Sequence, residues 1–244
     1  MYNGIDVSKH QKKIDWSKVK KDFVIIRCGY ANSDGTVTED AYFKTNMEGA
    51  LSQGIPCGVY LYSYLNDTAA AEKAAKQVLE MVKPYRLLYP LIFDFEHENR
   101  NSSKFKKANA EIIRAVLNVW EDAGYYAMWY TYKAFYTYAV DTEMLKPYDF
   151  WLAHYTAAGK KTDFNKPYGM WQYSSKGTCA GIAGNVDLNY SYRNYPDIIQ
   201  KNNLNGTGTV DVLFNDIRPV DAAKILKWAQ ENGLKAVQYD GRRF

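Results

Sequence analysis

The 244-residue chain is poor in cysteine and contains no long apolar run. Its three cysteines, Cys28, Cys57 and Cys179, are widely spaced and form no CxxC pair. This odd number and spacing argue against a disulfide scaffold and against a zinc ribbon, so we expect reduced, buried thiols. No apolar stretch reaches the roughly 18 residues that a membrane-spanning helix needs, so the sequence predicts neither a transmembrane segment nor a membrane partner.

A strong charge of one sign is also missing. Lys and Arg number 31 and Asp and Glu 27, and the resulting net charge of +4 is not gathered into a block. The sequence therefore predicts no nucleic-acid partner. The first residues, MYNGIDVSKHQ, contain neither the basic nor the apolar segment of a secretory leader, so we expect nothing in this sequence to direct the chain to the secretory route.

Aromatic residues, in contrast, are abundant, with 22 tyrosines and six tryptophans. These rings combine a flat apolar face with a polar tip. They suit a packed core, and they equally suit a groove that binds half-apolar ligands such as sugars. Composition alone leaves both roles open.

The first half of the chain alternates strand-like runs with helical patterns, which is typical of a parallel sheet. Helices are expected from about residue 40 to 54, from 67 or 68 to 82, and from 102 or 103 to 124, ending at glycines in two cases. The strand-like runs cover residues 4–8, 23–30, 57–65, 87–96 and 125–132.

Beyond residue 132 the rhythm changes. Three more strand-like runs, at 150–155, 169–175 and 186–192, have no long helical pattern between them. We therefore predict an α/β fold over residues 1–200: a modified (β/α) barrel of eight strands and about five helices whose last third has lost its helices.

A polar, glycine-containing segment, 201–209, is the expected linker to a small C-terminal unit, 210–244. This unit has the pattern of one βαβ module, with strands at 210–214 and 234–239 and a helix from Pro219 to Asn232. A module of this size buries little by itself. Packing on the barrel, wall binding and pairing with a second copy are open alternatives.

The segment LIFDFEHE carries the clearest chemical signal. Asp94 and Glu96 would lie two apart on one strand, on the same face, with Cα atoms about 6.6 Å apart from a rise of roughly 3.3 Å per residue. Two carboxyls at this distance shift each other's pKa, so that one stays protonated while the other is ionised. Glycosidic bond cleavage needs such a pair, although an ordinary solvated strand end is the alternative and the spacing favours neither stereochemical outcome.

Two further acids belong to predicted strands. Asp6 lies in the first strand and Asp187 in the last, and these strands are neighbours if the barrel closes. All four acids are then expected near the carboxyl ends of strands, the face on which barrel active sites lie.

His97 and Glu98 lack a second suitably placed histidine, so we expect no metal site and no cofactor.

Taken together, GIDVSKHQ, PLIFDFE, WQYS and VDLN resemble the glycoside hydrolase family 25 lysozymes, the N-acetylmuramidases of the Chalaropsis type. The resemblance covers residues 2–196 and implies cleavage of the β-1,4 bond between N-acetylmuramic acid and N-acetylglucosamine in bacterial peptidoglycan. It implies that Glu96 is the general acid and that Asp94 stabilises the oxocarbenium charge or orients the 2-acetamido group. Asp6 and Asp187 match two further active-site acids.

The same resemblance suggests substrate-binding aromatic residues. Tyr62 and Tyr64 match an aromatic strand that faces the cleft, and Trp151, Trp171 and Gln172 are further candidates that could equally be core. A muramidase without a leader but with a small appendage resembles a phage or prophage endolysin, held in the host cytoplasm until a holin releases it to the wall; a secreted lysozyme is the alternative. A non-catalytic glycan-binding barrel and another barrel glycosidase, such as a chitinase, are the competing functions.

Overall fold

The computed structural model describes residues 1–157, 160–207 and 219–231. The chain divides into two compact units, Met1–Gly208 and Thr209–Phe244. In the second unit the described residues form one helix, α6 (Pro219–Glu231), where the sequence predicts one. The strands predicted at 210–214 and 234–239 lie outside the described residues.

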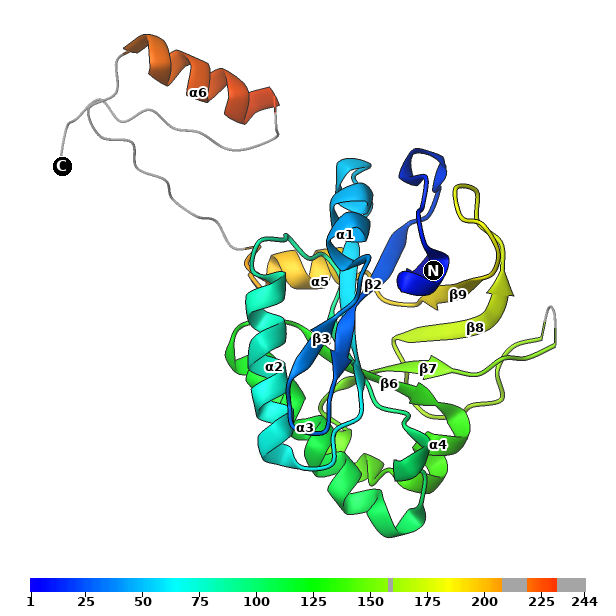
Figure 1. Ribbon diagram of the computed structural model, residues 1–244. Coiled ribbons are helices and arrows are strands. Elements are labelled where there is room, and N and C mark those ends of the chain that lie inside the picture. Colours follow the sequence, from blue (N-terminus) through cyan, green and yellow to red (C-terminus); the bar gives the residue numbers. More distant parts are fainter. Residues whose placement is uncertain (158–159, 208–218, 232–244) are drawn as a thin grey trace. The chain divides into compact units, whose positions relative to one another are not determined.

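The first unit is a closed barrel of eight strands with one additional strand (Figure 1). Strand order is β1-β9-β8-β7-β6-β5-β4-β2-β3, and pairing of β1 with β2 closes the ring and leaves β3 attached to the outside of β2. The predicted barrel and its strand number are confirmed. The strands are β1 (Tyr2–Val7), β2 (Phe23–Ala31), β3 (Val37–Glu39), β4 (Cys57–Ser63), β5 (Leu91–Asp94), β6 (Ala127–Tyr132), β7 (Asp149–Ala153), β8 (Met170–Gly177) and β9 (Val186–Ser191).

Strand direction is not uniform around the ring. Neighbouring barrel strands from β1 through β2 and β4 to β8 are parallel, but β9 is antiparallel to both β8 and β1. The start of β9 therefore lies at the same end of the barrel as the carboxyl ends of the other strands.

Helices cover only part of the barrel (Figure 1). The first four follow β3, β4, β5 and β6 in turn and contact the outside of strands β2 to β6, whereas α5 comes after β9. The expected number of about five helices in this unit is confirmed. They are α1 (Phe43–Ser52), α2 (Thr68–Val82), α3 (Lys106–Asp122), α4 (Lys133–Ala139) and α5 (Tyr195–Lys201). None of the described helices is long and apolar enough to span a membrane.

Local sequence explains how the longest helices begin and pack. The Asp67 carboxylate accepts a hydrogen bond from the Ala70 amide at 2.9 Å and so caps α2. The alanines of α2 allow α3 to approach closely, and the indole of Trp120 on α3 donates to the Ala75 carbonyl at 3.1 Å. Burial of these apolar faces, worth roughly 25 cal/mol per Å², holds the helices on the sheet.

Side-chain alternation divides the core in two. On β5, Leu91 and Phe93 belong to the cluster between sheet and helices, whereas Ile92 belongs to the cluster inside the barrel. Asp94 follows the same alternation and points inward. The inner cluster also takes Phe23, Ile25, Met128, Tyr130, Trp151 and Met170 from successive strands.

Residues 201–207, the first part of the expected linker, pack against the barrel unit. Asn205 is 2% exposed, and its amide nitrogen donates to the carbonyls of Leu87 and Tyr89 at 3.2 and 3.1 Å. Its amide oxygen accepts from the backbone N–H of Tyr126 at 2.7 Å. These bonds fix the chain at the end of the barrel opposite the acids.

The structure corrects several predicted boundaries. The run 87–96 is a strand only over Leu91–Asp94, so Glu96 lies beyond the strand, and the same-face argument for Asp94 and Glu96 does not apply. A 3-10 turn, Ser103–Phe105, precedes α3, which begins later than predicted. The short elements β3, α4 and α5 were not predicted from the sequence.

Candidate active site

Four carboxyl groups come together at one end of the barrel. Asp6 lies near the end of β1, Asp94 ends β5, and Glu96 follows two residues later. Asp187 is near the start of β9, not near a carboxyl end as expected, and reaches the same mouth because β9 is antiparallel. The residues that the sequence predicts as catalytic are therefore gathered in one place.

Asp6 and Asp187 are direct cross-strand partners. Their Cα atoms pair in the β1–β9 register, and a hydrogen bond joins the two carboxyls. Burial, followed by the negative charge of Asp6 and this hydrogen bond, raises the pKa of Asp187 to about 8. Burial also raises the pKa of Asp6, against the hydrogen bonds that it accepts.

Two side-chain amides donate to the same oxygen of Asp6. Gln172 Nε2 and Asn189 Nδ2 lie 2.9 and 2.8 Å from Asp6 Oδ2. The indole of Trp151 donates to Asn189 Oδ1 at 2.9 Å. Trp151 and Gln172, expected to bind substrate, thus contact the acids through buried hydrogen bonds.

Hydroxyl groups complete the surroundings of Gln172. Tyr130 and Tyr155 donate to Gln172 Oε1 at 3.0 and 2.7 Å. Tyr130 is buried in the barrel, whereas Tyr155 is 52% exposed at its mouth. One face of Tyr155 is therefore open to a ligand while its hydroxyl is held in place.

Glu96 has the electrostatic properties of a general acid. Burial, then the charges of Asp6 and Glu98, raise the pKa of Glu96 to about 7. A carboxyl with this pKa holds its proton in mildly acidic to neutral solution and can release it to a leaving group.

Asp94 is nearly as enclosed as Asp6. It is 5% exposed, and its Oδ1 has no hydrogen-bond partner among the described residues. Burial and the charges of Glu96 and Asp6 raise the pKa of Asp94, while the nearby Arg27 guanidinium opposes this rise. A buried, unpartnered carboxylate oxygen at a mouth is suited to accept a hydrogen bond from a bound ligand.

Arg27 itself is held by a buried ion pair. Its Nε and Nη2 both lie 2.7 Å from Asp40 Oδ2, and Asp40 is almost fully buried. Asp40 also accepts from the backbone amides of Lys9 and Tyr42 at 3.1 and 3.0 Å. These contacts hold the guanidinium in place. Its positive charge still acts on Asp94 and opposes the rise in the pKa of that carboxyl.

Aromatic side chains flank the mouth on the β4 side. The rings of Tyr62 and Tyr64 are 5.1 Å apart, and Tyr64 also makes an edge contact with His97 at 4.9 Å. The charges of Asp94 and Glu96 contribute to a raised pKa of Tyr62, which places this predicted substrate-binding residue beside the acids.

The structure does not bring Trp171 to the mouth. Between inward-facing Met170 and Gln172, alternation along β8 turns Trp171 to the outer cluster, where its indole donates to the His154 carbonyl at 2.9 Å. Its ring packs beside Tyr173 and Tyr190. The expectation that Trp171 binds substrate is therefore corrected: it is a core residue.

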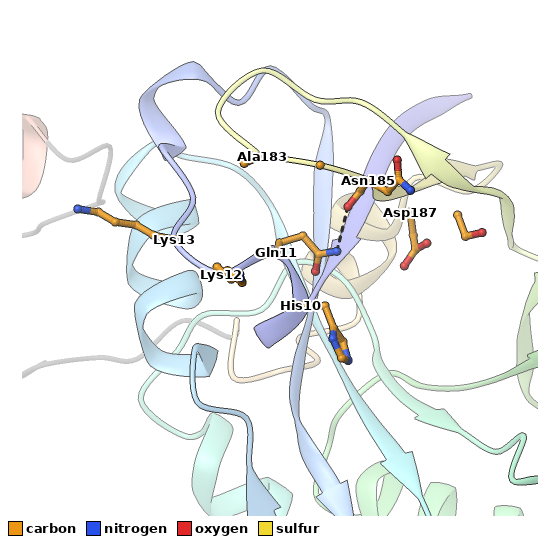
Figure 2. A pocket seen from close by; sticks show the side chains of 9 residues that line it. His10, Gln11, Lys12, Lys13, Ala183, Asn185 and Asp187 are labelled. Atoms are coloured by element: carbon orange, nitrogen blue, oxygen red, sulfur yellow. Dashed lines mark hydrogen bonds between the residues drawn. The ribbon is translucent and has the colours of Figure 1, made fainter.

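A hollow of about 730 Å³ adjoins Asp187 (Figure 2). Its walls are two loops, residues 10–13 after β1 and 183–187 before and into β9. Gln11 Nε2 donates to the Asn185 carbonyl at 3.2 Å and links the loops. Asp187 belongs to both the acid cluster and the wall of this hollow, so the cluster is open to a ligand on this side.

The described part of the chain contains no group of three or more His, Cys, Asp and Glu residues arranged to hold a metal ion. His97, near the acids in sequence, contacts the Tyr64 ring. The cysteines Cys28 and Cys57 are free and buried, whereas Cys179 is free and partly exposed.

Sequence reasoning missed four residues of the site: Arg27, Tyr130, Tyr155 and Asn189. Asn189 is part of the VDLN motif, two residues after Asp187, so strand alternation alone places it on the same face. The same rule places Arg27 with inward-facing Ile25. No pattern in the sequence distinguishes Tyr155 from the many other tyrosines.

Residues 5–182 match the family model of glycosyl hydrolases family 25. This match covers most of the chain, and the chain belongs to that family. Lysozyme M1 of Streptomyces globisporus is 28% identical over 201 residues, which are 76% of this chain and 66% of the relative.

Solved structures agree with this assignment. The modular autolysin LytC of Streptococcus pneumoniae is 31% identical, with a TM-score of 0.64. The match covers 77% of this chain and 46% of LytC. LytC has also been solved in complex with a synthetic peptidoglycan ligand. The CTP1L endolysin, 22% identical with a TM-score of 0.67, shares the fold over 100% of this chain and 84% of its own. The chain thus spans about half of LytC and about two thirds of Lysozyme M1.

Proposed function

We propose that this protein is a peptidoglycan hydrolase that cleaves the β-1,4 bond between N-acetylmuramic acid and N-acetylglucosamine. Membership in family 25 and similarity to Lysozyme M1 and to LytC support this activity. The observation that carries the proposal is the convergence of Asp6, Asp94, Glu96 and Asp187 at one barrel mouth.

Glu96 is the general acid in this proposal. Its carboxyl, with a pKa of about 7, donates its proton to the glycosidic oxygen as the bond to the anomeric carbon breaks. Departure of the protonated alcohol leaves positive charge on the sugar ring. The charges of the neighbouring carboxylates stabilise that charge because they act in a buried site.

Asp94 orients the 2-acetamido group of the sugar. Its buried Oδ1 has no partner among the described residues and accepts the acetamido N–H, so that the acetamido oxygen is turned toward the anomeric carbon. This hydrogen bond replaces the missing partner and favours the ionised form of Asp94. The exposed rings of Tyr64 and Tyr155 and the half-buried ring of Tyr62 provide faces for neighbouring sugars.

Analysis of the cleaved ends tests this function. Purified peptidoglycan is digested, the products are reduced with borohydride, and the reduced sugar is identified by mass spectrometry. Reduced muramic acid supports the proposal. Reduced glucosamine would instead indicate a chitinase-like glucosaminidase, and no release of fragments would indicate a glycan-binding barrel.

The proposed biological setting is a phage or prophage lysin that acts on the bacterial cell wall. The fold shared with the CTP1L endolysin supports this setting. Release from the host cytoplasm through a holin is part of the proposal, with secretion as the alternative. We assign wall binding or self-association to the C-terminal unit, Thr209–Phe244.

A further inference from the structure

Asp6 lies at the centre of a buried hydrogen-bond network. Its Oδ2 accepts from Gln172 Nε2 and Asn189 Nδ2, and all three side chains are at most 4% exposed. Two amides from neighbouring strands, β8 and β9, thus donate to one carboxylate oxygen. Their Cα atoms are paired in the β8–β9 register, so both approach Asp6 from the same level of the barrel.

The orientation of the Asn189 amide follows from chemistry. An indole N–H can only donate a hydrogen bond, so the amide atom 2.9 Å from Trp151 Nε1 must be the oxygen. The amide nitrogen then faces Asp6 Oδ2 and can only donate. Trp151 therefore fixes the oxygen of Asp6 that faces Asn189 as a hydrogen-bond acceptor.

Gln172, on the neighbouring strand β8, is also bonded at its amide oxygen and donates to Asp6 through its amide nitrogen. Two hydroxyls, from Tyr130 and Tyr155, meet its Oε1, and its Nε2 donates to the same Asp6 oxygen. An oxygen that accepts two N–H bonds has little capacity left for a proton. Two N–H donors on one carboxyl stabilise its ionised form. In the Asp6–Asp187 pair, which is joined by a hydrogen bond, they therefore favour the proton on Asp187.

We propose that Asn189 and Gln172 are positioning residues that keep Asp6 ionised and Asp187 protonated, and so fix a negative charge beside Glu96. This inference rests on the proposed function only in assigning the Glu96 proton to catalysis. The amides act through Asp6 and need not touch the substrate. Trp151, Tyr130 and Tyr155 act one step further out: the Trp151 indole fixes which end of the Asn189 amide faces Asp6, and the two tyrosine hydroxyls donate to the Gln172 oxygen.

The charges around Glu96 support this role for Asp6. After burial, the charge of Asp6 is the largest cause of the raised pKa of Glu96. The hydrogen bonds of Asn189 and Gln172 lower the pKa of Asp6 and so favour its ionised form. The titratable groups that face or influence Glu96 are Asp6 on β1, Tyr62 on β4, Asp94 on β5 and Glu98 after it, Tyr130 and Tyr132 on β6, Tyr155 after β7, and Asp187 on β9.

Carboxyl titration by NMR tests the inference without any assay of hydrolysis. Protein labelled with ¹³C at Asp and Glu side-chain carboxyls is titrated from pH 3 to pH 9, with signals assigned from Asp6→Asn, Asp187→Asn and Glu96→Gln. We expect Asp187 to titrate above Asp6. In Gln172→Met, loss of a hydrogen bond to the charged group should raise the Asp6 midpoint by about one pH unit and lower that of Glu96. In Trp151→Phe, the Asn189 amide loses the donor that orients it, so both midpoints should shift in the same directions by a smaller amount.

Trp120→Phe is the matched control, because it also removes a buried indole N–H, the one that donates to the Ala75 carbonyl on the helical side of the barrel. It should leave all three midpoints unchanged. Asp6 titrating above Asp187 in the natural chain, or unchanged midpoints in both folded variants, would overturn the inference. A folded, titrating protein that releases no peptidoglycan fragments would refute the proposed function while leaving this inference intact.

Discussion

Asp6 and Asp187 are opposite each other on β1 and β9, the two strands that complete the barrel, and their carboxyls share a hydrogen bond. Two ionised carboxylates cannot stay this close in a buried site, so the pair retains a proton. This proton is part of the catalytic environment, because the charge that remains on the pair raises the pKa of Glu96. Closure of the barrel therefore creates the electrostatics of the site.

Replacing Glu96 by Gln should abolish hydrolysis and leave the fold intact. The amide has the shape of the acid but cannot give a proton to the leaving oxygen, and general acid catalysis is worth about 10²–10⁴-fold. The rate of muropeptide release and the thermal midpoint are measured together. Glu72→Gln, which changes an exposed carboxyl on α2, is the control. A Glu96→Gln rate above about a tenth of the original would exclude Glu96 as the acid.

The activity of the enzyme should fall as pH rises through neutrality. A general acid acts while protonated, so the alkaline limb of kcat/KM should fall as pH rises through about 7, the pKa of Glu96. Asp6→Asn removes a negative charge beside Glu96, lowers the pKa of Glu96 and should move this limb to lower pH. The rate measured on a soluble glycan from pH 4 to pH 9 checks both statements. An alkaline limb that stays in place in Asp6→Asn would remove Asp6 from the network.

Asp94 should matter most for substrates that carry the acetyl group. Its buried, unpartnered Oδ1 accepts the acetamido N–H in the proposed complex. Asp94→Asn should therefore lower kcat strongly on acetylated glycan, with a smaller effect on chemically de-N-acetylated glycan, which the natural enzyme already cleaves slowly. The natural enzyme and Asp94→Asn are compared on the two substrates. Equal fold losses on both would show that Asp94 acts on the ring charge alone.

The acid cluster should also destabilise the fold as pH rises. Glu96 and Asp187 have folded-state pKa values of about 7 and about 8, above their ordinary values of 4.5 and 3.8. The folded chain therefore binds more protons than the unfolded chain between these limits, and the free energy of unfolding falls as pH increases from about 4 to 8. Asp187→Asn can still donate a hydrogen bond to Asp6 without carrying charge.

Asp187→Asn should consequently raise the thermal midpoint at pH 8 and have little effect at pH 4.5. Each kcal/mol corresponds to roughly 2–4 °C for a chain of this size. Glu72→Gln, which changes an exposed carboxyl on α2, is the control and should leave the pH dependence unchanged. A midpoint of Asp187→Asn that equals or falls below that of the original chain at pH 8 would contradict the raised pKa.

The sequence predicted the positions of the barrel strands better than their directions. Strand-like runs located β1, β2 and β4 to β9 because these strands are rich in β-branched or aromatic residues. The antiparallel β9 was not predicted, although the connection 178–185 is shorter than the dozen or so residues that a parallel crossover needs. The three residues of β3, Val37–Glu39, form too short a run to be recognised.

The acids of the site could be predicted because charged residues in apolar runs are conspicuous. The neighbouring candidates could not be ranked from the sequence, since Trp151 and Trp171 both lie in predicted strands and the structure separates them by the face of the strand on which each lies. The strand run 87–96 ends at Asp94, where pairing stops, and hydrophobicity alone does not reveal that end. Burial and register, which set the pKa of Glu96, are properties of the closed barrel.

The C-terminal unit should be dispensable for bond cleavage and necessary for attack on whole walls. All proposed catalytic residues lie in Met1–Gly208. Asn205 forms three side-chain hydrogen bonds to the barrel unit, so a functional truncation should end after Gly208 rather than before Asn205. A linked wall-binding or self-associating unit raises the effective concentration of the barrel on a polymeric substrate.

Full-length protein and chain 1–208 are compared by light scattering, thermal melting and rates on soluble muropeptides and on intact walls. We expect equal rates on muropeptides and at least a tenfold loss on walls for chain 1–208, in line with the 10²–10⁴-fold range of avidity effects. A second truncation at residue 203 should melt lower, because it leaves the Leu87 and Tyr89 carbonyls unpaired. Equal lysis of walls by the full chain and by 1–208, with a lower melting point for 1–208, would assign the C-terminal unit a stabilising role instead.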